Sequence, residues 1–159
     1  MRLAAHDIRE PRLRQVFAYW DSKRHGRAML SRADLDPVEI PRLLAYLYLV
    51  DIAPDIAQSR FRLYGTAVAE FFGRDNTGQR LADVDADDVD RLLDDHGRAA
   101  AGAAVYMHGA VFTRDHSDAT YHRLLLPLAR DGRTADMLLC AVDFDDPISG
   151  ILPHTLRAV

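Results

Sequence analysis

Apolar residues at helical spacing define the first element of the chain. Four side chains recur at positions i, i+3, i+4 and i+7, which places them on one face of a helix: Leu13, Val16, Phe17 and Trp20. Pro11 suits the first turn of such a helix, and Gly26 suits its end. The pattern predicts an amphipathic N-terminal helix over about residues 8–25.

The pattern then changes to that of β-strands. Five segments are rich in aliphatic and aromatic residues and are bounded by turn-forming residues. They are Leu43–Val50, Arg60–Tyr64, Val105–Thr113, Thr120–Ala129 and Thr134–Phe144. The sequence Asp131-Gly132 favours a tight hairpin between the last two.

Helical signals separate the second predicted strand from the third. Thr66 can cap a short helix that runs through Phe72. An acidic group that suits a helix N-terminus precedes a longer helix, which extends to about Gly102: Asp85, Asp87 and Asp88. A one-faced stripe follows this acidic group: Val89, Leu92, Leu93 and His96.

Three of the predicted strands contain nearly continuous apolar runs, at 43–50, 124–128 and 137–142. A strand with one wet face should alternate instead, so we expect both faces of the sheet to be covered. The middle helices can cover one face, and the N-terminal helix or a second subunit can cover the other. The fold class is therefore α+β: a five-stranded antiparallel sheet with helices on one face and the amphipathic helix beside it.

This order of elements resembles that of PAS domains. Several short stretches resemble a family of bacterial single-domain PAS-like proteins: Tyr19-Trp20, Lys23-Arg24, Gly26-Arg27, Ser31-Arg32-Ala33-Asp34, Asp36-Pro37, Leu49-Val50-Asp51, Arg60-Phe61-Arg62-Leu63-Tyr64-Gly65-Thr66, Gly73-Arg74-Asp75, Thr77-Gly78, Leu124-Leu125-Leu126-Pro127-Leu128 and Asp131-Gly132. The resemblance covers roughly residues 15–144. It implies a PAS fold, a small-molecule pocket or an interaction role, and no known reaction; it transfers no binding residue.

Length and composition limit the domain organisation and the class of partner. For 159 residues, 48% of them hydrophobic, we expect one domain with a core at about 36–144, an irregular tail at 145–159 and no output domain. The net charge of −4 argues against nucleic acid as a partner. No apolar run reaches the roughly 20 residues of a membrane span, and the N-terminus lacks a signal peptide's apolar core. We expect a cytoplasmic protein.

Aromatic residues in the predicted strands are the candidate contacts for a small ligand. Five of them could border a pocket between sheet and helices: Tyr48, Phe61, Tyr64, Tyr106 and Tyr121. His96 continues the apolar stripe of the long helix, so it could also point inward. The alternative for all six is ordinary core packing, with His96 bonded to a backbone carbonyl.

The sequence identifies no cofactor and predicts no metal site. One histidine on a helix is weak evidence for haem, and the cysteine motif of flavin photoreceptors is absent. Cys140, the only cysteine, lies in an apolar strand and suits a buried structural thiol. The spacing of His108, His116 and His122 matches no zinc motif, and no acidic residue lies at ligand spacing to them.

Three functions remain open. The first is a signalling module that binds a small, mostly apolar molecule and signals to an unidentified signalling protein whether this ligand is bound. The second is a ligand-free homodimer with Leu13, Val16, Phe17 and Trp20 at its interface. The third is an enzyme of the α+β cone type, an isomerase or dehydratase, which would need a buried His–carboxylate pair in an open pocket. We expect a protein that is not an enzyme.

Overall fold

The computed structural model describes residues 2–84, 89–114 and 117–145. Its helices are α1 (Pro11–Arg24), α2 (Thr66–Phe72) and α3 (Val89–Ala100). Its strands are β1 (Leu47–Asp51), β2 (Arg60–Tyr64), β3 (Val105–Arg114), β4 (Ser117–Leu128) and β5 (Met137–Asp145). Short 3₁₀ turns connect several of these elements.

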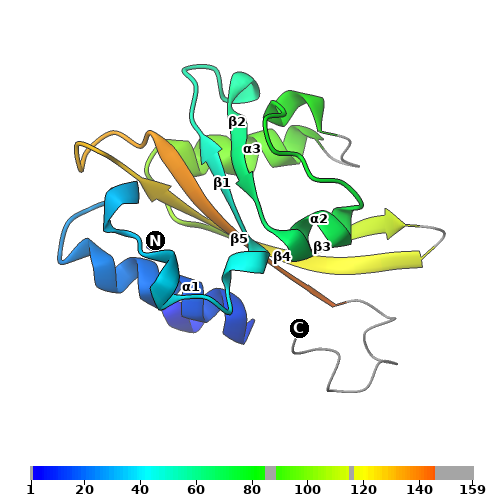
Figure 1. The fold of residues 1–159 in the computed structure, drawn as a ribbon, viewed down its shortest axis with the longest axis horizontal. Coiled ribbons are helices and arrows are strands. Elements are labelled where there is room, and N and C mark those ends of the chain that lie inside the picture. Colours follow the sequence, from blue (N-terminus) through cyan, green and yellow to red (C-terminus); the bar gives the residue numbers. More distant parts are fainter. Residues whose placement is uncertain (1, 85–88, 115–116, 146–159) are drawn as a thin grey trace.

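The strands form one antiparallel sheet in the order β2-β1-β5-β4-β3 (Figure 1). The predicted class, an α+β fold with five antiparallel strands, is confirmed. β4 and β5 are joined by the predicted hairpin. Asp131 Oδ1 accepts hydrogen bonds from the backbone N–H groups of Arg133 and Thr134, both at 2.8 Å, which fixes this turn.

Both faces of the sheet are covered, as the apolar runs indicated. Along β4, Leu124, Leu126 and Leu128 belong to a core with α1, whereas Leu125 belongs to a second core with α2 and α3. Figure 1 shows α1 on one side of the sheet and α3 on the other. Because successive side chains of a strand point to opposite faces, neighbouring leucines of β4 lie in two separate hydrophobic layers.

The apolar side of α1 is the cover of the outer sheet face, within the same chain. The residues expected at a dimer interface are buried here, with exposed fractions of 0–5%: Leu13, Val16, Phe17 and Trp20. The indole Nε1 of Trp20 donates a hydrogen bond of 3.1 Å to the carbonyl of Pro127 in β4. The expectation that these side chains contact a second subunit is therefore corrected: they pack on the sheet of their own chain.

Several predicted boundaries differ from those observed. Residues Leu44–Tyr46 form a 3₁₀ turn, so β1 begins later than predicted. Thr66 is the first residue of α2 and not its cap; Gly65 holds the cap position and has no side chain with which to bond. The acidic group at 85–88 and nearly all of the predicted tail lie outside the described residues.

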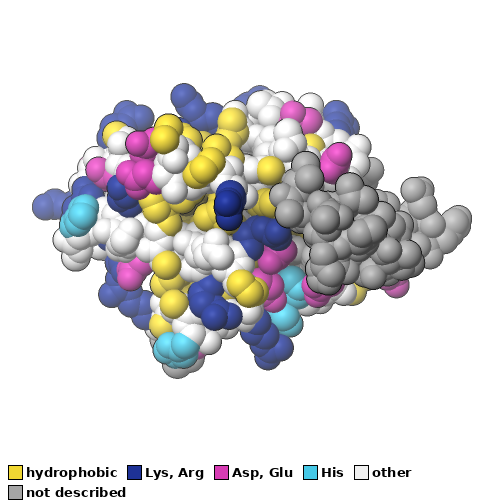
Figure 2. All heavy atoms as spheres, turned by 60° about the horizontal axis from the view of Figure 1, so that its bottom comes forward, with side chains coloured by type: hydrophobic (Ala, Val, Ile, Leu, Met, Phe, Trp, Pro, Cys, Tyr) yellow, Lys and Arg dark blue, Asp and Glu magenta, His cyan; other side chains and the backbone are white. Residues whose placement is uncertain are grey.

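Figure 2 shows the side of the molecule that carries α1, where acidic and basic side chains are interspersed with small hydrophobic areas. The outward positions of α1 are mostly polar, among them Arg14, Gln15, Asp21 and Ser22. No described helix combines the length and the apolar character needed to cross a membrane.

Candidate ligand-binding site

A cavity of about 440 Å³ lies between the sheet and helices α2 and α3. The volume is in the range of small-molecule sites. Apolar side chains from several elements line it, including Phe61, Phe72, Met107, Val111 and Phe112. These side chains come from β2, β3 and the end of α2. The cavity is therefore formed where three elements meet, and not by the displacement of a single loop.

Four of the predicted contacts lie at this cavity: Tyr48, Phe61, Tyr64 and Tyr121. The rings of Phe61 and Tyr64 pack edge to face with centroids 5.3 Å apart. The hydroxyl of Tyr64 accepts a hydrogen bond of 3.3 Å from Asn76 Nδ2. The site therefore has an aromatic wall with hydroxyl groups on it, which suits a ligand with a flat or aliphatic body.

Tyr106, the fifth aromatic residue expected at the ligand, does not line this cavity. Its neighbours Val105 and Met107 point towards the helices, and the alternation of β3 turns Tyr106 to the opposite face. There its hydroxyl donates a hydrogen bond of 2.6 Å to Oε2 of Glu10, at the start of α1. Any contact that Tyr106 makes thus belongs to the side of the sheet that α1 covers.

His96 is fully buried behind Tyr48 and does not line the cavity. Its Nδ1 lies 2.7 Å from the carbonyl oxygen of Leu92 and its Nε2 lies 3.1 Å from the hydroxyl of Tyr48. Burial raises the pKa of Tyr48 well above its usual value, so this hydroxyl is protonated and donates to Nε2. Both ring nitrogens are occupied, which leaves His96 without a free lone pair for a ligand.

Burial, with the charge of Arg123, lowers the pKa of His96 to about 3. The unfolded chain has a histidine pKa near 6.5, so between these values the unfolded state binds the extra proton and stability falls as the pH falls. We expect the free energy of unfolding to drop by about 2 kcal/mol from His96 between pH 7.5 and pH 5.0. Urea unfolding at both pH values should show this loss in the wild type and not in His96→Gln. Equal losses in the two proteins would contradict it.

Arg123 is the residue that the sequence analysis missed. It lines the cavity from β4, is only 5% exposed, and its Nε has no hydrogen-bond partner among the described residues. No acidic side chain within the described part of the chain forms an ion pair with it, and its guanidinium carbon lies 5.4 Å from the ring centroid of Tyr121. Tyr121 and Arg123 are two residues apart on one strand, so their side chains lie on the same face of the sheet.

A second buried polar group faces the same cavity. Asp95 in α3 is 6% exposed, and its Oδ2 has no hydrogen-bond partner in the described structure, although Arg91 Nε lies 4.0 Å away. Its other oxygen lies 3.4 Å from Nη1 of Arg98. The cavity thus combines an aromatic wall with a buried guanidinium and a buried carboxylate that still have capacity to bond, while the exposed Arg74 and Arg91 also line it.

Cys140 lies in β5 with its thiol fully buried. Burial raises the pKa of this thiol to about 12, so it stays protonated at neutral pH. A protonated, enclosed thiol is a poor nucleophile and a poor redox sensor. Cys140 therefore acts as a small core residue, as its apolar strand indicated.

Comparison with solved structures finds several chains with a similar fold. The PAS domain of Bordetella pertussis BvgS shares 15% identity over 79% of this chain and 95% of that one, with a TM-score of 0.42. The PAS domain of an HTR-like protein from Haloarcula marismortui shares 14% identity over 86% and 100% of the two chains, with a TM-score of 0.42. A light-oxygen-voltage domain studied with a flavin analogue shares 11% over 70% and 84%, with a TM-score of 0.44. No curated protein matches the chain.

The family model of the PAS domain gives the assignment. It matches residues 8–142, which include α1 and nearly all of the sheet together with α2 and α3. The match agrees with the observed strand order and with the helices between β2 and β3. The chain belongs to the PAS domain family.

Proposed function

We propose that this chain is a sensory module that binds a small organic acid in the cavity between its sheet and helices α2 and α3. PAS domains are generally sensory modules without catalytic activity. The expected ligand, a mostly apolar molecule, is refined here: the aromatic wall suits an aromatic or aliphatic body, and Arg123 suits an acidic group. A cytoplasmic location and the absence of catalysis remain predictions.

The observation that carries this proposal is the buried guanidinium of Arg123, whose Nε has no hydrogen-bond partner among the described residues. A buried charge without a partner costs several kcal/mol, so a fold that keeps one needs a compensating contact. A guanidinium offers parallel N–H donors that match the two oxygens of a carboxylate. An acidic ligand would supply that contact, and its own hydrogen-bond donor would satisfy Oδ2 of Asp95.

Ligand binding at Arg123 can affect the packing of α1 through β4. Arg123 faces the cavity, and the next residue, Leu124, packs in the core beneath α1. A ligand that shifts β4 would therefore change the packing of α1, provided that it binds the two arrangements with different affinity. We propose α1 and the sheet surface next to it as the route to a signalling protein.

The binding test uses thermal shift with pairs of compounds that differ only in charge. Aromatic and medium-chain carboxylic acids should raise the melting temperature, whereas the matching primary amides should bind at least about tenfold more weakly because they carry no charge for Arg123. Arg62→Met is the control, since Arg62 is an exposed arginine outside this cavity. Equal binding of acids and amides would exclude recognition through Arg123.

Arg123→Met separates a binding role from a structural one. Methionine fills similar space without a charge, so we expect the ligand-free variant to be more stable than the wild type by about 1 kcal/mol or more. The same variant should lose the response to carboxylic acids. Urea unfolding of the ligand-free proteins measures the first effect. A variant that is less stable than the wild type would indicate that Arg123 holds the fold together instead.

The other two functions receive less support. The side chains expected at a dimer interface are buried within the chain, so a homodimer would need another surface. No described histidine lines the cavity, so the His–carboxylate pair that an isomerase or dehydratase would need does not lie there. A protein that responds to no acid and forms a ligand-free dimer would favour the interaction domain.

A further inference from the structure

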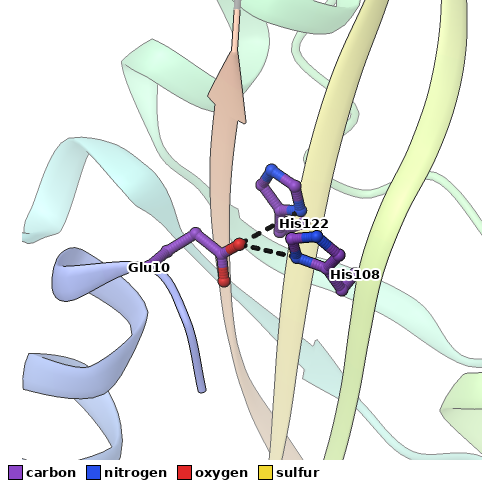
Figure 3. A group of neighbouring side chains, drawn as sticks. All are labelled: Glu10, His108 and His122. Carbon is purple, nitrogen blue, oxygen red and sulfur yellow. Dashed lines mark hydrogen bonds and ion pairs between the residues drawn. The ribbon is translucent and has the colours of Figure 1, made fainter. Parts of the chain in front are cut away.

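Three side chains from distant parts of the sequence meet on the sheet face opposite the cavity. Glu10 lies just before α1, His108 lies in β3 and His122 in β4 (Figure 3). Oε1 of Glu10 lies 2.8 Å from Nδ1 of His108 and 3.3 Å from Nδ1 of His122. One donor atom from each of the three residues lies within 4.8 Å of the others. The two imidazole rings stack with centroids 4.3 Å apart.

The hydrogen bonds around His122 leave two acceptors facing one another. The backbone N–H of Gly109 donates to Nδ1 of His122 at 3.0 Å, so this nitrogen carries a lone pair. Nε2 of the same ring, which then carries the proton, lies 3.2 Å from the carboxylate of Asp145. Oε1 of Glu10 lies 3.3 Å from the same Nδ1, so two acceptor atoms lie close together without a proton between them. A cation between the two atoms would relieve this arrangement.

The donor set is that of a transition-metal site. Two imidazole nitrogens and one carboxylate oxygen suit Zn²⁺ and related divalent ions, whereas Mg²⁺ and Ca²⁺ prefer oxygen donors only. Partners that orient the donors are also present. The carboxylate of Asp145 bonds the second nitrogen of His122, and the hydroxyl of Tyr106 donates to Oε2 of Glu10. Such partners fix the tautomer and strengthen metal ligands.

We infer that Glu10, His108 and His122 form a binding site for one divalent transition-metal ion, with Zn²⁺ as the reference ion. The ligand atoms are Oε1 of Glu10 and Nδ1 of both histidines, and water completes the coordination. Nδ1 of His108 then loses its proton to Nε2, so the exposed Arg9, whose Nη1 lies 3.3 Å from Nε2, turns away. Gly109 likewise gives up its bond to His122. The bound ion links the start of α1 to β3 and β4 by coordinating one residue from each.

The test is isothermal titration of chelator-treated protein with ZnCl₂ in a neutral to slightly basic buffer. We expect one equivalent of Zn²⁺ bound by the wild type. His108→Ala and His122→Gln should each weaken Zn²⁺ binding by at least about tenfold. Removal of a residue that only orients a metal ligand already costs about that much. His25→Asn is the matched control, because His25 is exposed and lies outside this group. It should bind as the wild type does.

A second readout separates a specific site from loose surface binding. Zn²⁺ should raise the melting temperature of the wild type and of His25→Asn but not of His108→Ala, since only specific binding to the folded state stabilises it. His108 is an exposed position, and far-UV circular dichroism checks that this variant folds. Unchanged Zn²⁺ affinity in both histidine variants would overturn the inference, as would equal affinity for Mg²⁺ or the absence of binding.

Discussion

Replacing Gly65 by alanine is expected to reduce the free energy of unfolding by about 3 kcal/mol or more. Gly65 connects β2 to α2, and its backbone N–H donates a hydrogen bond of 2.8 Å to the carbonyl of Leu47 in β1. A Cβ atom at this position would lie 2.3 Å from the carbonyl oxygen of Ala45 and 2.6 Å from that of Leu47. Both are backbone atoms, so the added methyl group cannot be accommodated by a side-chain rotation.

Gly97→Ala is the control for this variant. Gly97 lies inside α3, and a Cβ there would have its nearest neighbour, Cγ2 of Ile56, at 4.0 Å. Alanine at a helical position without a clash should stabilise the protein by about 0.5–1 kcal/mol. We therefore expect the two Gly→Ala changes to alter the free energy of unfolding in opposite directions, which urea unfolding measures. A Gly65→Ala protein as stable as the wild type would show that β2 and α2 are not held this close to β1.

The second large effect is expected for Trp20→Ala, which should cost about 3–5 kcal/mol of unfolding free energy. Trp20 is 4% exposed, packs against Phe17 with ring centroids 5.7 Å apart, and bonds the carbonyl of Pro127. Its removal would leave a cavity between α1 and the sheet and an unpaired carbonyl beneath it. Urea unfolding measures the loss.

Gln15→Ala is the control on the same helix. Gln15 is exposed, so the change should stay within about 0.5 kcal/mol. A Trp20→Ala protein that loses less than about 1 kcal/mol would contradict the packing of α1 on its own sheet. Conversion of a dimer into a stable monomer by this change would instead support the interface expected from the sequence.

Much of the fold could be predicted because its signals are local. The spacing of Leu13 and Trp20 indicated a helix with one apolar side, and the turn at Asp131-Gly132 indicated the hairpin of β4 and β5. The continuous leucine run of β4 indicated that the sheet is buried on both faces. The sequence could not decide whether α1 covers its own sheet or another copy's, because the same apolar side suits either partner.

The candidate site was only partly predictable. An aromatic residue in a strand, such as Tyr121, can be assigned to a face only after one neighbour on that strand has been placed. The sequence alone therefore could not separate Tyr106, which lies on the face beneath α1, from the residues that line the cavity. Arg123 was recoverable from its spacing to Tyr121. The histidine group was not, because the carboxylate that completes it, Glu10, is 98 residues away from His108. Such a contact depends on how α1 lies across the sheet.

The most direct test of a ligand-binding role is native mass spectrometry of the wild type and Arg123→Met, both purified from the cells in which the protein is naturally made. The wild type should carry an acidic compound whose mass is lost on denaturation, and the folded Arg123→Met variant should not carry it. A wild type without any added mass, or the same compound retained by the variant, would contradict recognition of an acid by Arg123.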